Sequence, residues 1–160
     1  MTTTENRAHV AGRRSREAVI TRDKQAWLEV FADDAIVQDP IGPSVFDPEG
    51  KGHRGKAAIS AFWDNAIAPT DRIEFHFVDT FQCGDEEANV GSIVITMGGH
   101  QITTEGVFTY QADSEGRLVA LRAYWEMDRA AATARPVSPA TLAADPPSPG
   151  GSATGPKPVM

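Results

Sequence analysis

The sequence predicts an α+β domain in which a curved antiparallel sheet is covered on one side by three N-terminal helices. Two observations lead to this fold class. Apolar residues with helical spacing occur in segments before residue 70, and four segments with strand-like alternation follow one another after it. Consecutive strands joined by short turns form an antiparallel meander, and the preceding helices then pack on one of its faces.

The three helices are expected in the first half of the chain. Residues 6–21 form the first, and Asp23 has the short polar side chain typical of the N-cap of the second. A short strand at Ala35–Asp39 and a long loop separate the second helix from the third, which starts near Gly55. Each of the last two helices has an apolar stripe: Trp27, Leu28 and Phe31 on one, and Ile59, Phe62, Trp63 and Ile67 on the other.

The four strands are expected at residues 71–82, 88–97, 100–111 and 117–127. Gly98 and Gly99 join the second to the third, and two adjacent glycines are a hairpin signal. Alternation gives each strand an inward and an outward face. In the third strand the inward face carries Ile102, Thr104, Gly106, Phe108 and Tyr110.

A change of composition ends the patterned part of the chain. Seven of the 11 prolines lie between Pro136 and Pro158, among small residues and almost no large apolar side chains. Such a segment cannot bury enough apolar surface to offset the entropy that is lost on ordering. We therefore expect one domain over residues 1–131 and a disordered tail over residues 132–160.

Charge and composition restrict the classes of partner. The formal net charge is −7 and the pI is near 5.0, so neither nucleic acid nor an anionic membrane surface is an expected partner. No stretch approaches about 18 consecutive apolar residues, and the first residues lack the apolar core of a secretory signal. The single cysteine, Cys83, excludes an internal disulfide. These features predict a cytoplasmic protein.

Asp39 is the first candidate for a functional residue. It ends the short strand and precedes Pro40, which favours an extended backbone and gives the Asp39 side chain a fixed direction. Apolar neighbours on both sides indicate a dry environment, which raises the pKa of a carboxyl and makes it a better proton acceptor at neutral pH. A general base and a simple turn residue are both consistent with this stretch.

Three segments resemble the ketosteroid isomerase branch of the NTF2-like (SnoaL-like) superfamily. They are FADDAIVQDPIG, the glycine-flanked helix with Phe62 and Trp63, and the closing VFTYQADSEGRLVALRAYWE. The resemblance extends over about residues 6–128. It implies a cone of helices and sheet whose apolar mouth binds a small apolar, steroid-like ligand, and it implies a homodimer that pairs through its sheets.

The resemblance also implies roles for individual residues. The family's general base falls on Asp39, in the matching Asp-Pro-hydrophobe-Gly context. The family's two oxyanion donors are a tyrosine and a protonated aspartate. In this sequence they fall on Ser15 and Gly106, neither of which has the same donor group. The expected substrate-binding residues are Ser15, Phe31, Phe62, Trp63, Gly106, Phe108, Tyr110 and Trp125.

Other side chains are available to replace the missing donors. The candidates are the Ser15 hydroxyl acting through a water molecule, the phenol of Tyr110, and the indole N–H of Trp63 or Trp125. Each also has a plain structural interpretation, as pocket wall, as core or as a small helix residue. Losing one oxyanion donor typically lowers the rate by about 10²–10³-fold, so the replacement decides whether the chain is an effective isomerase.

The loop over residues 43–55 is longer than the family's connection. Val45 and Phe46 are consistent with a lid over the mouth of the cone and also with a solvated surface loop. The run from Gly50 to Lys56 matches part of a phosphate-binding loop, but Ala57 stands where a hydroxyl is required, so nucleotide binding is not expected. The 4 histidines show no metal-ligand spacing, and no metal or cofactor is expected.

Three hypotheses for the function remain open. The first is a steroid Δ5-isomerase-like enzyme in which Asp39 shifts a double bond of a 3-oxosteroid or a similar apolar ketone. The second is a non-catalytic protein that binds a small hydrophobic, steroid-like ligand. The third is another SnoaL-like activity such as polyketide cyclisation. The site has to decide among them, because this fold hosts many activities.

Overall fold

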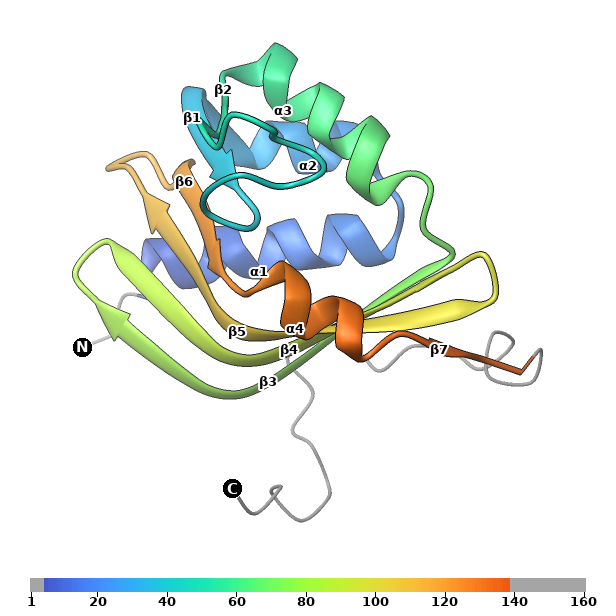
Figure 1. Cartoon of the computed structure of the whole chain (residues 1–160). Coiled ribbons are helices and arrows are strands. Elements are labelled where there is room, and N and C mark those ends of the chain that lie inside the picture. Colours follow the sequence, from blue (N-terminus) through green and yellow to red (C-terminus); the bar gives the residue numbers. More distant parts are fainter. Residues whose placement is uncertain (1–4, 139–160) are drawn as a thin grey trace.

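A curved, seven-stranded sheet carries helices α1, α2 and α3 over its concave side (Figure 1). The computed structural model describes residues 5–138. The helices are α1 (Arg7–Ile20), α2 (Lys24–Val30), α3 (Lys56–Phe62), which continues into a π-helical turn (Trp63–Ile67), and α4 (Met127–Ala132). The strands are β1 (Phe31–Gln38), β2 (His53–Arg54), β3 (Arg72–Cys83), β4 (Glu86–Met97), β5 (His100–Ala112), β6 (Leu118–Tyr124) and β7 (Arg135–Pro136).

The predicted meander forms most of the sheet. Strands β3, β4, β5 and β6 are neighbours in chain order, and each adjacent pair runs antiparallel. β1 pairs with β6 in parallel, with Val37 opposite Leu121, and β2 pairs antiparallel with β1 at the edge. β7 pairs with the first residues of β5. The sheet curves around the helices without closing, which confirms the predicted α+β class.

Capping side chains confirm the predicted helix starts. Asn6 accepts a hydrogen bond from the N–H of His9 at 3.0 Å, and Asp23 accepts one from the N–H of Ala26 at 2.9 Å. α3 follows Gly55, whose φ of 87° suits glycine. The predicted stripe on this helix is buried: Ile59, Phe62, Trp63 and Ile67. None of the helices within residues 5–138 is long and apolar enough to span a membrane.

The sequence pattern places Phe31 on the second helix, but the structure places it in β1. Phe31 caps the C-terminal end of α2 with an extended backbone (φ −92°, ψ 143°) and pairs with Leu118 of β6. The pairing with β6 therefore begins directly after α2. As a result β1 starts at Phe31 instead of Ala35, and it ends one residue before Asp39.

The C-terminal segment of the fold extends past residue 131. The last long strand ends at Tyr124, and the chain continues as α4 and β7. The hydroxyl of Thr133 accepts a hydrogen bond from the N–H of Thr103 at 2.7 Å, and β7 pairs with β5. Residues 132–138 therefore pack on the sheet, although the composition predicts that they belong to a disordered tail. The remainder of that predicted tail lies outside the described residues.

The expected alternation on β5 fails at the start of the strand. Thr104 is buried as predicted, but Ile102 is 37% exposed and Gln101 is 5% exposed. Arg135 of β7 donates a hydrogen bond to the side chain of Gln101 at 2.7 Å. The C-terminal segment therefore buries Gln101. The alternation of residues within β5 could not predict this, because the covering residues lie elsewhere in the chain.

Two glycines face each other where the sheet bends. Gly91 of β4 and Gly106 of β5 are register partners, and β3 has a bulge beside them. A Cβ at Gly91 would lie 2.2 Å from the carbonyl oxygen of His76, and one at Gly106 would lie 1.9 Å from that of Tyr124. Neither position has room for a side chain, so these glycines permit the close backbone approach on which the curvature depends.

Trp27 lies at the centre of the core between the helices and the sheet. Its ring centre is 4.8 Å from that of Phe31, 5.3 Å from that of Trp63 and 6.4 Å from that of Phe62. Such aromatic clusters bury large apolar areas and dominate the energetics of a core of this size. The core thus ties α2 and α3 to β1, the strand that directly precedes Asp39.

Gly106→Ala is expected to lower the free energy of unfolding by about 1–3 kcal/mol, because the new methyl group meets the Tyr124 carbonyl and a strand has to shift. Urea denaturation followed by tryptophan fluorescence measures the change. Ser92→Ala, on β4 opposite Glu105, is the control and should change it by less than about 0.5 kcal/mol. Equal stability of the Gly106 variant and the wild type would contradict this account of the bend.

Candidate functional site

Asp39 directly follows β1, where the chain leaves the sheet. On its N-terminal side the backbone is fixed by the pairing of Gln38 with Arg122 of β6. On its C-terminal side the N–H of Ile41 donates a hydrogen bond to the carbonyl oxygen of Ala123 at 3.0 Å. Backbone contacts with β6 on both sides therefore hold the carboxylate in place.

Trp125 contacts this carboxylate directly. Its indole Nε1 donates a hydrogen bond to Oδ1 of Asp39 at 2.6 Å. Burial raises the pKa of Asp39 above its ordinary value, while the hydrogen bond from Trp125 and the charge of His53 act in the opposite direction and lower it by less. Part of the residue's surface stays open to solvent. The result is a carboxyl that binds a proton more readily than a solvated one does, in a residue that is partly rather than fully buried.

His53 is a neighbour of Asp39 that sequence reasoning missed. It lies on β2 opposite Val37 of β1, and its ring centre is 4.9 Å from that of Phe62. When protonated, it favours the charged form of Asp39. The pairing that brings His53 to the site spans the whole loop between β1 and β2, so no local sequence pattern reveals it.

Tyr110 points inward from β5 and lies against Gly12 of α1, where an added Cβ would be 2.7 Å from its ring. Burial raises the pKa of the phenol, Arg16 lowers it by its charge and by a hydrogen bond, and the charges of Glu87 and Asp39 raise it. The hydroxyl is thus within electrostatic reach of both Arg16 and Asp39. The Arg16 guanidinium lies over the ring of Tyr110, with 5.5 Å between its carbon and the ring centre, and it can only donate hydrogen bonds, so it does not compete for the phenol O–H.

Ser15 and Gly106, where the resemblance places the family's two donors, have other surroundings. Ser15 is 2% exposed at the contact between α1 and α2, where its Oγ accepts a hydrogen bond from Nε1 of Trp27 at 3.0 Å. Gly106 has no space for a side chain because the carbonyl of Tyr124 lies across it. Ser15 therefore joins α1 to α2, and Gly106 lets the backbone of Tyr124 pass close to β5.

The aromatic residues predicted to bind substrate divide between the core and the site. Phe31 and Trp63 are 1% and 5% exposed and pack on Trp27, so they belong to the core. Phe62 also packs on Trp27, and its other contact is the ring of His53. Phe62 therefore connects the core to the neighbourhood of Asp39.

An apolar surface on the concave side of the sheet stays partly exposed. Phe108 is 5% exposed and stacks on Phe77, with 5.5 Å between the ring centres. Phe77 and four other inward-facing apolar side chains are only partly buried, and together they form the concave apolar surface: Phe75, Phe77, Ile93, Ile95 and Leu121. Leu121 lies in register between Val37 and Tyr110, so this surface reaches the site of Asp39. A ligand that covers it removes apolar area from water.

The loop over residues 43–55 has one residue against the site and one in solvent. Phe46 packs on Phe62 of α3, with 6.2 Å between the ring centres, whereas Val45 is 72% exposed. The carboxylate of Asp47 accepts hydrogen bonds from the N–H groups of Lys51 at 3.3 Å and Gly52 at 2.7 Å. A phosphate-binding loop offers such N–H groups to its anion, and here a carboxylate occupies them.

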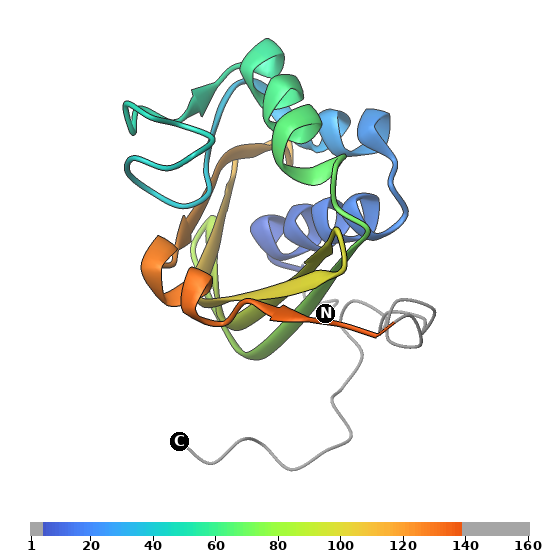
Figure 2. The same ribbon diagram turned by 45° about the vertical axis from the view of Figure 1, so that its right-hand side comes forward.

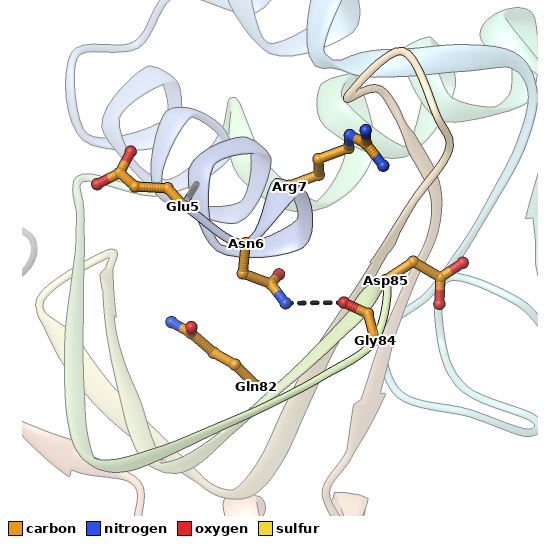
Figure 3. A pocket seen from close by; sticks show the side chains of 6 residues that line it. All are labelled: Glu5, Asn6, Arg7, Gln82, Gly84 and Asp85. Carbon is orange, nitrogen blue, oxygen red and sulfur yellow. Dashed lines mark hydrogen bonds between the residues drawn. The ribbon is translucent and has the colours of Figure 1, made fainter. Parts of the chain in front are cut away.

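A separate hollow of about 470 Å³ lies where the start of α1 meets the turn between β3 and β4 (Figure 3). Asn6 Nδ2 donates a hydrogen bond to the carbonyl oxygen of Gly84 there, at 2.9 Å. Neither Trp125 nor His53 lines this hollow, so it is distinct from the site of Asp39. Within residues 5–138, no group of three or more histidine, cysteine, aspartate or glutamate side chains is placed to hold a metal ion.

Comparisons with known proteins agree on one family. A model of the SnoaL-like domain matches residues 13–121. The crystal structure of RV0760c from Mycobacterium tuberculosis is 36% identical, with 80% of this chain and 97% of that chain covered and a TM-score of 0.75. The Δ5-3-ketosteroid isomerase from Mycobacterium sp. is 36% identical, with 82% and 98% covered and a TM-score of 0.74.

RV0760c also has a structure in complex with estradiol-17beta-hemisuccinate, which is 34% identical, with 78% of this chain and 98% of that chain covered and a TM-score of 0.73. No curated protein sequence matched the chain. The similarity to these structures extends over nearly the whole of each of them. The residues that the family model matches, 13–121, include Asp39 and most of the sheet.

Trp125→Phe is expected to raise the pKa of Asp39 further, because the variant loses a hydrogen bond that favours the charged carboxylate. NMR titration of the Asp39 carboxyl carbon measures the shift. Trp63→Phe is the control, since Trp63 packs in the core and its replacement should leave that pKa unchanged. An unchanged or lower pKa in Trp125→Phe would mean that the hydrogen bond does not favour the charged form.

Proposed function

Because this chain belongs to the SnoaL-like family of the NTF2-like superfamily, we propose that it binds a steroid-sized apolar ketone and that Asp39 transfers a proton between two carbons of that ketone. The observation that carries the proposal is the Asp39 carboxyl, which has a raised pKa and lies beside a partly exposed apolar surface. The 36% identity to a Δ5-3-ketosteroid isomerase supports the same chemistry.

In the proposed step Asp39 acts as a general base. Trp125 holds Oδ1, which leaves Oδ2 to accept the proton from the carbon next to the carbonyl. The C–H electron pair forms a new C=C bond, and the carbonyl π electrons move to oxygen to give a dienolate. Asp39 then returns the proton to the far end of the conjugated system, so the ketone re-forms with its double bond shifted. The step consumes no oxidant, reductant or second substrate.

The dienolate oxygen needs a hydrogen-bond donor, and Tyr110 is the candidate. Its hydroxyl is within electrostatic reach of Asp39, and the neighbouring Arg16 guanidinium, which only donates hydrogen bonds, cannot accept its O–H. The raised pKa of the phenol keeps it protonated at neutral pH, as a donor must be. One donor of this kind typically contributes about 10²–10³ in rate.

A non-catalytic protein that binds a steroid-like ligand is the second candidate function. The surroundings of Ser15 and Gly106 favour it, because neither position provides the donor that the family's isomerases use. The complex of RV0760c with estradiol-17beta-hemisuccinate supports a ligand of this class. Binding and catalysis share the concave apolar surface and differ only in whether Asp39 turns a ligand over.

We also propose that the convex face of the sheet pairs with a second copy of the chain. Helices α1, α2 and α3 all lie over the other face (Figure 2). Large apolar side chains on β3 and β6 remain about half exposed: Val78 (50%), Phe81 (55%) and Tyr124 (51%). Val107 lies in register between Val90 and Tyr124, so apolar residues continue across the sheet. An exposed apolar patch of this kind is typical of an interface.

Asp39→Asn is expected to lower the rate of double-bond isomerisation by at least about 10²–10⁴-fold, because it removes the proton acceptor and keeps the shape. The absorbance of the conjugated product formed from 5-androstene-3,17-dione measures the rate. Steroid affinity should hold or improve, since a partly desolvated charge is gone. Asp33→Asn, on the exposed side of β1, is the matched control. Unchanged turnover in Asp39→Asn would refute the mechanism, and binding without turnover in the wild type would favour the second candidate.

The same variant also has a predicted effect on stability. The Asp39 pKa is raised in the folded state, so the folded protein binds its proton more tightly than the unfolded chain does. The charged carboxylate therefore costs stability above the folded-state pKa, and this cost disappears below the unfolded-state pKa. Asp39→Asn should melt at an equal or higher temperature than the wild type at pH 7, and this advantage should vanish in acid. A lower melting temperature at pH 7 would indicate a turn residue.

Sedimentation equilibrium tests the proposed dimer. The wild type is expected at about twice the chain mass of 17.2 kDa at micromolar concentration. Val107→Glu places a charge in the middle of the apolar face and should shift the protein toward the monomer, whereas Val45→Glu, on the exposed loop, should not. A wild type that sediments as a monomer would exclude this interface.

A further inference from the structure

Arg16 is a buried cation beneath the concave apolar surface. The residue lies on α1 and is 6% exposed. Its guanidinium carbon is 5.2 Å from the ring centre of Phe77 and 5.5 Å from that of Tyr110, which are inward-facing residues of β3 and β5. Arg16 therefore lies between α1 and the sheet, and one of the two rings that it covers belongs to the partly exposed surface.

The protein does not satisfy the hydrogen-bonding capacity of this guanidinium. Its guanidinium lies over the rings of Phe77 and Tyr110, and within residues 5–138 its Nη1 has no hydrogen-bond partner. None of the ion pairs among those residues includes Arg16. A buried charge is unfavourable unless it is paired, and an unsatisfied buried donor in a native structure calls for an explanation.

The nearby carboxylate of Glu87 is already engaged by other groups. Its side chain is fully buried, and Oε2 lies 2.6 Å from Nδ1 of His9. Gln82 donates a hydrogen bond to Oε2 at 3.3 Å, and Asn89 donates one to Oε1 at 3.1 Å. Glu87 is thus held by three side chains, none of which is Arg16, and the cation is left without a carboxylate of its own.

We propose that Arg16 binds a carboxylate of the ligand, so that the ligand of the concave apolar surface is an apolar, steroid-like acid. This inference rests on the binding site of the proposed function and adds the chemical class of its ligand. A carboxylate matches the two parallel N–H groups of a guanidinium, whereas a neutral carbonyl or hydroxyl satisfies one donor and leaves the charge unpaired.

The position of Arg16 also keeps the ligand's charge apart from Asp39. The phenol of Tyr110 responds to the charges of both Arg16 and Asp39, whereas the groups that act on Asp39 are Trp125 and His53. Arg16 and Asp39 are therefore both near Tyr110, but Arg16 is not among the groups that act on Asp39. A ligand carboxylate at Arg16 and a reacting ketone at Asp39 would occupy opposite ends of one apolar molecule.

Two probes of the same shape test this inference: 3-oxo-4-androstene-17β-carboxylate and its primary carboxamide. Isothermal titration calorimetry at neutral pH measures the affinity of each for four proteins: the wild type, Arg16→Met, Arg16→Gln and Arg13→Met. Arg13 lies on the same helix with a side chain that is 39% exposed, and its replacement is the control for removal of a positive charge. The thermal melting of each variant establishes that it is folded.

The wild type and Arg13→Met are expected to bind the carboxylate about tenfold to a hundredfold more tightly than the carboxamide, the range that a hydrogen-bonded charge pair contributes. Arg16→Met should bind both probes with similar affinity. Arg16→Gln, whose neutral amide suits polar surroundings, should do the same and replaces the Met variant if that variant unfolds.

Two outcomes would overturn the inference and leave the proposed apolar site standing. One is equal affinity of the wild type for the two probes, and the other is a preference for the carboxylate that persists in a folded Arg16 variant. If the wild type binds neither probe, the steroid-sized site of the proposed function fails, and the inference fails with it.

Discussion

At Gly106 the backbone of Tyr124 passes so close to β5 that no Cβ fits between them. This approach depends on glycine, and the next residue along the chain is Trp125, whose indole reaches the carboxylate of Asp39. Gly91 permits a similar approach between β4 and β3. The hydrogen bond that orients Asp39 therefore depends on two glycines, Gly91 of β4 and Gly106 of β5. Neither of them contacts the carboxylate. The curvature of the sheet and the geometry of the site have one cause.

The charged groups around Tyr110 differ in how many hydrogen-bond partners the protein provides for them. Glu87 is held by His9, Gln82 and Asn89, so it needs no ligand. Asp39 has one hydrogen bond, from Trp125, and remains partly open to solvent. The buried Nη1 of Arg16 has no hydrogen-bond partner among the residues that the structure describes. Incompletely satisfied polar groups beside an apolar surface are typical of binding sites, because a ligand supplies the missing partners. Asp39 and Arg16 are two such groups, and the charges of both act on Tyr110 beside the concave apolar surface.

Local sequence signals predicted the parts of this structure that local physics determines. Asp23 caps its helix, and the two glycines after β4 form the hairpin, because capping and turn geometry depend on a few adjacent residues. His53 and Arg16 were not predicted as site residues. Strand pairing across a long loop brings His53 to the site, and Arg16 is buried against the ring of Tyr110, which is far from it in the sequence. Trp125 was predicted to bind substrate, but only the fold shows that its indole holds Asp39.

In the proposed function the Asp39 carboxylate removes a proton from the carbon next to a ketone. Hydrogen–deuterium exchange at that carbon, followed by NMR on a saturated 3-oxosteroid in D₂O, detects this step without requiring a complete isomerisation. Catalytic amounts of the protein are predicted to exchange these hydrogens much faster than buffer alone, because the base and the apolar surface hold the ketone together. Exchange no faster than in buffer, with the steroid shown to be bound, would contradict the account.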